Sequence, residues 1–550
     1  MKNNNLFKKK VSKKTRNAFI ILLIFMILYF FIVIWLINKS KIQNGSSQPI
    51  NTMNLTLEQK KQDFEILYDI ISTSVSSIDE FKKIYGIDFI NNKGKYLELI
   101  NKSTDDFSFY LYMYVILQQI PSCHTSVCFP DFMQYGHFAH NSDDLFNDLS
   151  VEPAAKYWYK IIFEQCASIP EYKALIFNYV NGCYAYNPDA SIIEIDKGED
   201  AQLEMINNME IDNYIREELS VYKMRYDNTR DVIYRPVLIF NDSVGKNVDL
   251  KIKLSNGKSI TKSCFADIKC EFLTSYGYIF EKDEIEEEDT GDSEGLYMYD
   301  DLSLKTTYIN IQNFQNNKLG VQINNILKNS EQVDNVILDL RNNSGGLLKF
   351  SETYIYPQLF SSNIISNWEN YLPITKYTKV IKGKKSWDEL GYSTYDNALP
   401  FESGIKKYMS NIVTQKFIGK AKKSKNVYIL ISENTASAAD NFTAILKENN
   451  LATVIGRNTY GEGFGDTFFT EVLPNSKIVF NFMASSGMNS NNKLNNVYGT
   501  EPDIYSELSL DSYYKRKKIE NENMDASTYE NRLKWDNVLL RAIEEIEKKQ

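Results

Sequence analysis

The sequence predicts an α/β protein, and three observations support this fold class. The apolar run VYILI at residues 427–431 is typical of a buried strand, and a helix-like amphipathic segment follows it directly. A second apolar run, residues 336–340, follows the helix-like segment 320–327. Between residues 177 and 272, apolar and polar residues alternate as they do in strands. Strands and helices that alternate along one chain predict layered α/β units.

The composition is that of a globular protein with more than one domain. The chain has 550 residues, of which 43% are hydrophobic and 13% aromatic. This length exceeds what one core usually holds, so two or three domains are expected. The net charge of −9 disfavours a nucleic-acid partner, because phosphate binding requires concentrated Lys and Arg.

The first 55 residues predict a membrane anchor. Residues 18–37 carry no charge and are long enough to cross a hydrocarbon core of about 30 Å as a helix. Residues 1–17 are basic, which predicts a cytoplasmic N-terminus, and residues 38–55 form a polar linker. We therefore expect a single-pass signal anchor in the cell membrane, with the C-terminal domains outside the cytoplasm. The alternative is a cleaved signal peptide, but the apolar core is long and no A-x-A site follows it.

Residues 56–176 predict a helical N-terminal domain, because apolar residues recur there at helical spacing up to about residue 120. Pro121 and Pro130 then bracket a short exposed segment.

The cysteines are even in number and lie in the part of the chain expected outside the cytoplasm, where disulfides form. The pairs closest in sequence are Cys123 with Cys128 and Cys264 with Cys270, although sequence alone leaves the connectivity open. A metal site is disfavoured, because no CxxC motif occurs and only Cys123 adjoins a histidine. No metal or organic cofactor is expected.

Residues 177–280 predict a β-rich module that includes a hairpin, in which Asn256 and Gly257 supply the positive φ angles of a tight turn. The acidic stretch 281–298 is typical of a solvated linker, and the ligand spacing of a calcium-binding EF-hand is missing from it. We place the core domain at residues 299–550. Within it, residues 367–409 are tyrosine-rich and predicted to be irregular, either lining a substrate cleft or covering the sheet.

Ser437 lies at the predicted junction between the buried strand and the following helix. Backbone N–H groups at a helix start lack intrahelical partners, so a hydroxyl exposed there suits a nucleophile beside an oxyanion site. The alternative is that the small Ser-Ala pair only caps a tightly packed helix.

Two motifs in this region resemble a known family. The stretch TASAAD at residues 435–440, followed by VIGRNTYGEG, resembles the C-terminal processing and tricorn-type serine peptidases, whose nucleophile is the third residue of the small-residue motif. The stretch VILDLRNNSGG at residues 336–346 resembles the family's strand and glycine turn. The resemblance implies Ser437 as nucleophile, with oxyanion N–H groups from Gly345, Gly346 and Ala438. It also implies a crotonase-like spiral core and a PDZ-like identity for the β-rich module, although a β-rich subdomain without a ligand remains open.

His124 is the candidate general base. A serine hydroxyl is a weak nucleophile until a base takes its proton, and a neutral imidazole has a suitable pKa. The segment Ser122-Cys123-His124-Thr125 resembles the base motif of the tricorn-type branch in position and in its His-Thr pair, but the two residues before the histidine differ. Without this resemblance, a loop histidine is more often structural.

The chain departs from the processing-peptidase branch at residue 462. That branch carries a lysine base 25 residues after the serine, where this chain has Glu462. A carboxylate with an ordinary pKa near 4 is a poor base for a serine proton, so His124 becomes the only credible base. The tricorn-type branch also has an orienting glutamate before a glycine and a Pro-Asp pair, where this chain has Asn495 and Asn496. Asn496 and Glu462 are therefore the candidates for orienting the histidine, with Glu501 as a further guess.

The sequence thus predicts a membrane-anchored, extracytoplasmic serine endopeptidase that acts on polypeptides through a Ser nucleophile and a His base. The alternative is a catalytically inactive relative that binds peptides or other ligands. The oligomeric state stays open.

Overall fold

The computed structural model describes most of the chain from residue 53 onward, and Thr52–Gln550 form one compact unit. The described residues are 53–130, 151–167, 174–188, 195, 200–217, 224–241, 247–266, 269, 272–273, 296–301, 303–330, 332–378, 386–465, 468–489 and 491–549.

The fold class predicted from the sequence needs one correction. Among the described residues, no helix is both long and apolar enough to cross a bilayer, so the transmembrane helix is not part of the fold found here. Residues 18–37, where that helix was predicted, lie outside the described part of the chain, as do residues 281–295 of the acidic linker. The α/β class itself is confirmed by mixed sheets packed with helices. The domain boundaries, the crotonase-like spiral and the PDZ-like identity stay predictions.

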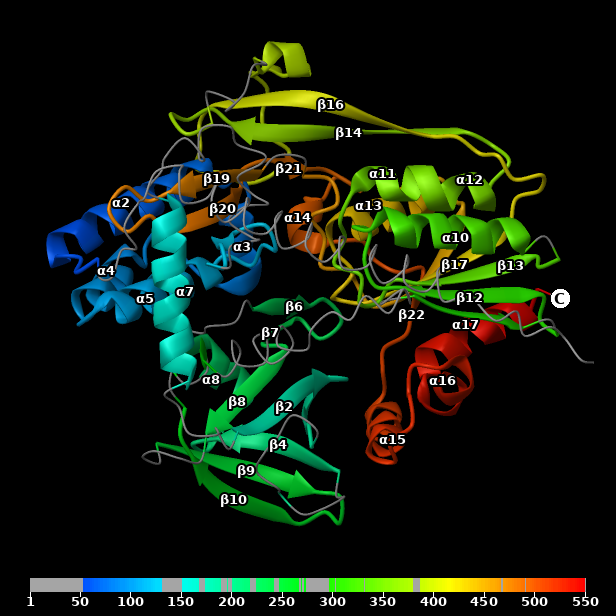
Figure 1. Ribbon diagram of the computed structural model, residues 1–550, viewed down its shortest axis with the longest axis horizontal. Helices are drawn as coiled ribbons and strands as arrows, with labels where there is room; N and C mark the ends of the chain where they lie inside the picture. Colours follow the sequence, from blue (N-terminus) through cyan, green and yellow to red (C-terminus); the bar gives the residue numbers. More distant parts are fainter. Residues whose placement is uncertain are drawn as a thin grey trace, which may run out of the picture. The chain divides into compact units, whose positions relative to one another are not determined.

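A six-stranded sheet forms the centre of the core region (Figure 1). Its neighbours pair in parallel except for the edge strand β11, which runs antiparallel to β12. Strands β12 and β13 are buried along their whole length, which explains their continuous apolar runs. In order across the sheet, the strands are β11 (Leu296–Asp301), β12 (Thr306–Ile311), β13 (Asn335–Asp339), β17 (Asn426–Ile431), β18 (Ala452–Gly456) and β22 (Ile504–Tyr505).

Helices cover both faces of this sheet. Successive strand residues point to opposite faces, so Leu338 packs with one group of helices and Ile337 with the other. One face carries α10 (Asn317–Asn329), α11 (Leu348–Phe350), α12 (Tyr356–Leu359) and α13 (Ser437–Glu448). The other carries α16 (Tyr529–Trp535) and α17 (Asn537–Glu547), and α17 is the amphipathic C-terminal helix that the sequence predicts.

The predicted N-terminal helices are present. Capping boxes begin two of them, because Thr56 and Asp105 each exchange hydrogen bonds with the residue three positions on. The helices are α2 (Leu57–Ser74), α3 (Ile78–Tyr85), α4 (Lys93–Asn101), α5 (Asp106–Gln118) and α7 (Val151–Ala167).

A two-residue strand links this helical region to the core. Strand β1 (Ser126–Val127) pairs antiparallel with β20 (Val479–Met483), which also pairs with β19 (Phe468–Val472). The backbone N–H of Cys128 extends the ladder by donating to the carbonyl oxygen of Val479 at 2.8 Å. The segment just before β1 is thereby fixed against residues more than three hundred positions later.

The β-rich region is an antiparallel sheet with the predicted hairpin at its edge. The turn needs a positive φ only at Gly257, at 82°, and not at Asn256 as expected from the sequence. Helix α8 (Ile211–Glu217) and the separate pair β6 (Arg225–Asp227) and β7 (Val232–Tyr234) accompany the sheet. The sheet contains β10 (Ser259–Cys264), β9 (Val248–Leu254), β4 (Ala201–Ile206), β3 (Cys183–Tyr186), β2 (Ala174–Val180) and β8 (Val237–Asn241), with β5 (Met209–Glu210) beside β4.

The tyrosine-rich segment 367–409, predicted to be irregular, contributes to a second sheet of the core region mainly at its two ends. Two ten-residue strands, β14 (Ile364–Pro373) and β16 (Tyr408–Phe417), pair along their whole length. Strands β15 (Ser393–Tyr395) and β21 (Ser486–Gly487) complete this sheet. The remaining short helices are α14 (Asn495–Tyr498) and α15 (Leu510–Asn521).

Candidate active site

Ser437 occupies a sharp turn between β17 and α13. Its φ angle is +51°, a left-handed conformation that is unfavourable for a residue other than glycine. The turn is held by Thr435, whose hydroxyl donates to the carbonyl oxygen of Leu340 at 2.7 Å, and by the Ser437 N–H, which donates to the carbonyl oxygen of Gly461 at 2.9 Å. The serine therefore stands at the strand-to-helix junction that the sequence predicts, on a strained backbone that surrounding contacts maintain.

His124 reaches Ser437 from the helical region. Its Nε2 lies 3.4 Å from the Ser437 Oγ, although the two residues are 313 positions apart. Strand β1 sets this placement, together with Thr125, whose buried hydroxyl accepts a hydrogen bond from the Met483 N–H at 3.0 Å. The imidazole stacks on Phe468 and is 23% exposed. The distance to the hydroxyl is longer than in a reacting complex, which is common when no substrate is bound.

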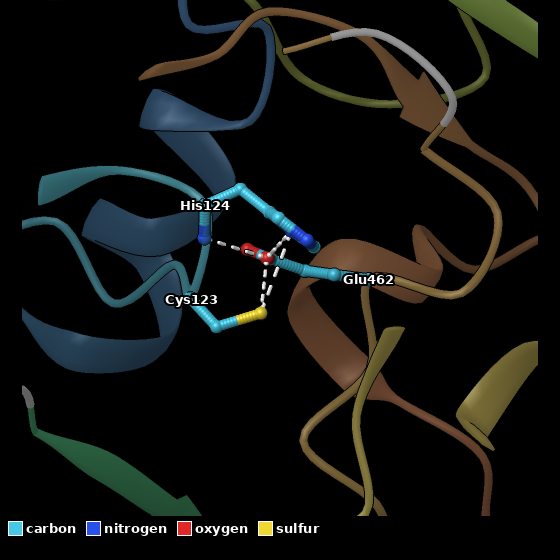
Figure 2. A group of neighbouring side chains, drawn as sticks. All are labelled: Cys123, His124 and Glu462. Atoms are coloured by element: carbon cyan, nitrogen blue, oxygen red, sulfur yellow. Dashed lines mark hydrogen bonds and ion pairs between the residues drawn. The ribbon is translucent and has the colours of Figure 1, made fainter. Parts of the chain in front are cut away.

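Glu462 contacts the imidazole nitrogen that does not face Ser437, and Figure 2 shows its carboxylate beside His124. Its Oε2 is 2.5 Å from the His124 Nδ1 and also accepts the His124 backbone N–H at 3.1 Å. A carboxylate at Nδ1 favours the tautomer with the proton on Nδ1, so the lone pair of Nε2 faces Ser437. The serine, the imidazole and the carboxylate therefore stand in a line in which Nε2 can take the proton of the serine hydroxyl.

The environment of Glu462 keeps it ionised. Burial acts to raise the pKa of this carboxyl, but the charge and hydrogen bond of His124, helped by bonds from Cys123 and Ser122, outweigh burial and hold the pKa below its ordinary value. Glu462 also has a positive φ, at +62°. Both Ser437 and Glu462 thus adopt unfavourable backbone conformations, as residues at functional sites often do.

A buried polar network fixes the loop that carries Glu462. The Asp440 carboxylate accepts hydrogen bonds from Asn495 Nδ2 at 2.8 Å, from the Gly463 N–H at 3.2 Å and from the Thr459 hydroxyl. Burial raises the pKa of Asp440 more than these bonds lower it. The Asn495 Oδ1 accepts the Gly463 N–H at 2.7 Å. Asp440 and Asn495 therefore position the loop that carries Glu462. The sequence signal for this role is the acidic residue Asp440 in the motif TASAAD.

Two of the three predicted oxyanion donors are available. The Gly345 N–H donates to Asn343 Oδ1 at 2.9 Å, so this bond occupies it. Within the described part of the chain, the N–H groups of Gly346 and Ala438 donate to no other group. Gly345 matters instead for packing, because a Cβ there would stand 2.7 Å from the Ser437 Cβ. Gly346 and Ala438 therefore remain the candidate donors.

The other candidates for orienting the imidazole lie elsewhere. The amide of Asn496 bonds the backbone, donating to the carbonyl oxygen of Ser485 at 3.3 Å and accepting the Gly487 N–H at 3.2 Å. Glu501 is bound by Lys493 at 3.0 Å. Of the three residues considered from the sequence, the structure brings only Glu462 to His124.

A cavity of about 440 Å³ lies beside the serine turn, and its lining includes Ala436, Ser344, Tyr460 and Arg225. Arg225 comes from β6, and its guanidinium lies 4.6 Å from the centre of the Tyr460 ring and donates to the carbonyl oxygen of Glu433. No local sequence signal marked Arg225, because its place depends on how β6 packs against the core.

Cys123 and Cys128, one of the two cysteine pairs closest in sequence, do not form a disulfide, and both are thiols. The Cys123 side chain points at Glu462 and that of Cys128 is buried in a small apolar cluster. The other pair close in sequence includes Cys270, which lies outside the described residues.

Part of the chain is similar to known proteins. The model of peptidase family S41 matches residues 305–506. A probable CtpA-like serine protease of Staphylococcus aureus (strain COL) is 30% identical over 164 residues, which are 30% of this chain and 26% of the relative. A probable CtpA-like serine protease of Staphylococcus epidermidis is 30% identical over 160 residues, 29% of this chain and 26% of the relative. The matching part of the chain thus spans about a quarter of the length of these relatives.

Among solved structures, mature CPAF complexed with lactacystin is 12% identical, with a TM-score of 0.48 and coverage of 85% of this chain and 97% of that chain. The photosystem II D1 C-terminal processing protease is 11% identical, with a TM-score of 0.34 and coverage of 83% and 96%. Tricorn protease is 12% identical, with a TM-score of 0.35 and coverage of 89% and 37%. These scores are too low to carry an argument, so the assignment depends on the sequence match. The match to peptidase family S41 thus covers residues 305–506, which include Ser437 and Glu462.

Proposed function

We propose that this protein is a serine endopeptidase in which Ser437, His124 and Glu462 act together. The family match supports the peptidase activity, and the geometry of the three side chains supports the mechanism. The single observation that carries the mechanism is the line from a buried carboxylate through an imidazole to the hydroxyl of a strained serine. Three separate segments of the chain provide these groups.

The reaction follows from these positions. Nε2 of His124 takes the proton of the Ser437 hydroxyl as the oxygen attacks the peptide carbonyl, and the imidazolium then gives that proton to the leaving amine. Glu462 stabilises the imidazolium and keeps its ring oriented, without itself becoming protonated. Water then hydrolyses the acyl-enzyme with the same base.

The negative charge on the carbonyl oxygen needs hydrogen-bond donors. The N–H groups of Gly346 and Ala438 fill this role, and removing one such donor typically costs about 2.7 to 4 kcal/mol of barrier. The cavity lined by Ala436 and Arg225 is the candidate site for the part of the substrate next to the scissile bond. The extracytoplasmic location stays a prediction from the sequence.

The test compares the purified wild-type chain with Ser437→Ala and His124→Ala on an unstructured protein substrate and on a serine-directed fluorophosphonate probe. We expect hydrolysis and covalent labelling by the wild type only. Ser361→Ala is the matched control, because this serine is exposed and bonds Ser424 outside the site, so it retains activity and labelling. Equal behaviour of wild type and both site variants would favour the alternative, an inactive relative that binds peptides.

A further inference from the structure

Cys123 stands beside the proposed catalytic groups, and no step of the proposed reaction uses it. Its Sγ lies 2.7 Å from Glu462 Oε2 and 3.4 Å from His124 Nδ1. Figure 2 shows the thiol, the imidazole and the carboxylate converging on one point, with the carboxylate oxygen between the other two. Two of these residues are adjacent in sequence, and the third comes from the loop fixed by Asp440 and Asn495.

These three groups are a ligand set for a divalent metal ion. A thiolate sulfur, an imidazole nitrogen and a carboxylate oxygen are the donors that Zn²⁺ prefers, and here they all lie within 4.8 Å of one another. A second observation points to a ligand. Glu462 is 2% exposed, and its other oxygen, Oε1, has no hydrogen-bond partner in the described structure. A buried carboxylate oxygen without a partner is costly, and a metal ion would supply that partner.

The spacing of the donors suits a tetrahedral ion. Zn–S bonds of about 2.3 Å and Zn–N bonds of about 2.0 Å place ligand atoms about 3.5 Å apart. The sulfur and Nδ1 are already at 3.4 Å. Oε2 is closer to both than a coordinated oxygen would be, so the carboxylate must shift when a metal ion binds. Three protein ligands then leave one position for water.

We propose that Cys123, His124 and Glu462 bind Zn²⁺ and that this binding reversibly switches the peptidase off. The proposal rests on the proposed function, since it assigns a regulator to the same site. Its chemical basis is the tautomer of His124. A metal ion on Nδ1 takes the lone pair there and leaves the proton of the neutral ring on Nε2. An imidazole with a proton on Nε2 donates to Ser437 and cannot take the proton from its hydroxyl.

The protons balance in this step. The proton of Nδ1 is replaced by the metal and the ring carries its proton on Nε2 instead, so the imidazole loses none overall. The thiol becomes a thiolate and releases one proton to solvent. Glu462 is ionised before and after. No electron is transferred, and a chelator that removes the ion restores the starting state.

Metal binding is tested first without activity. Ser437→Ala protein, which cannot digest itself, is titrated with Co²⁺ as a spectroscopic substitute for Zn²⁺. We expect a thiolate-to-cobalt charge-transfer band that Zn²⁺ abolishes by competition. Adding Cys123→Ser to this variant removes the band. Adding Cys183→Ser leaves it, because Cys183 is a thiol on strand β3 of the β-rich sheet. A band that survives Cys123→Ser, or no band at all, overturns the proposed site.

Inhibition is tested next on the active chain. Each variant's rate is expressed relative to its own rate in the presence of a chelator, so changes in basal rate do not matter. Loss of the thiolate ligand in Cys123→Ser should raise the Zn²⁺ concentration for half inhibition roughly 10- to 100-fold or more, whereas Cys183→Ser should not change it. Equal inhibition of both variants overturns the switch.

The two proposals can fail separately. Peptidase activity that Zn²⁺ does not inhibit leaves the proposed function intact and removes the switch. A cobalt band that depends on Cys123, in a chain without peptidase activity, overturns the proposed function and the switch, and leaves a metal site of another purpose.

Discussion

Two buried ionic clusters join distant parts of this chain, and they differ in how completely their charges are compensated. In the first, Arg341 bridges Asp339 and Asp536, with Nη2 at 2.6 Å from one carboxylate and 2.5 Å from the other. All four carboxylate oxygens of that cluster have partners, including Tyr308 and the Leu539 N–H. In the second, Glu462 holds His124, and one of its oxygens has no hydrogen-bond partner in the described structure.

The difference indicates what each cluster does. Burial acts to raise the pKa of Asp339 and of Asp536, but the charges and bonds of Arg341 and Arg532 outweigh it and hold both pKa values below their ordinary range. A fully compensated cluster with fully buried carboxylates fixes α16 and α17 against the sheet. The second cluster has a partly exposed imidazole and a spare oxygen, so it can exchange a proton or accept a ligand. The charged residues of the DLR motif are thus structural, while Gly346 after it is a candidate oxyanion donor.

The largest expected effect comes from neutralising the incomplete cluster. Glu462→Gln removes the charge that stabilises the imidazolium and allows the wrong imidazole tautomer, so kcat should fall by about 10⁴-fold, as when the aspartate of a Ser-His-Asp triad is replaced by asparagine. The free energy of unfolding should change far less, which denaturant unfolding would show. Glu501→Gln is the control, since its partner is Lys493, and it should keep full activity. Retention of activity in Glu462→Gln would mean that another group orients His124.

Breaking the complete cluster should damage stability instead of chemistry. Asp536→Ala leaves the mostly buried Arg341 partly uncompensated, removes two of its hydrogen bonds and deletes the cap of α17, so the free energy of unfolding should fall by about 3 to 5 kcal/mol. The control is Asp511→Ala, which removes an exposed pair with Lys515 that is worth no more than about 1 kcal/mol. Comparable losses in the two variants would show that the buried cluster contributes nothing special.

The complete cluster should also dominate acid sensitivity. Because folding lowers the pKa values of Asp339 and Asp536, the unfolded chain binds more protons than the folded protein once the pH drops below about 4. The contribution of these two carboxylates to the free energy of unfolding should therefore be complete above that pH. It should decrease as the pH falls through their pKa values in the folded protein. Denaturant unfolding at several pH values measures the slope, and Asp536→Asn should make it shallower. An unchanged slope would assign the acid sensitivity to other carboxyl groups.

Local patterns in the sequence predicted the strand β17 and the helix that starts at Ser437, because a continuous apolar run and a small-residue turn determine both within about twenty residues. The capped N-terminal helices and the hairpin at Gly257 were predictable for the same reason. Strands β14 and β16 were missed, since their pairing partner lies about forty-five residues away and neither strand alternates cleanly.

The site was predictable only in part. Ser437 and His124 came from short motifs, but their meeting depends on β1, which is two residues long and has no signal of its own. The role of Glu462 depends on a positive φ and on contacts from Asp440 and Asn495, which are long-range facts. Glu462 stands where the resemblance places a lysine base, and it contacts His124 instead.

The smallest expected effect concerns strain at the nucleophile. Ser437→Ala and Ser437→Gly should both abolish peptidase activity, but only glycine lacks the Cβ that makes a φ of +51° unfavourable. The glycine variant should therefore unfold with a free energy about 1 kcal/mol higher than the alanine variant, after allowing for the greater freedom of glycine in the unfolded chain. Asn450→Gly is a useful comparison, because Asn450 has a similar φ of +55° at an exposed helix end. Asparagine tolerates the left-handed conformation, so this substitution should raise the free energy of unfolding little. If the alanine variant proved as stable as the glycine variant, the turn at Ser437 would store no strain.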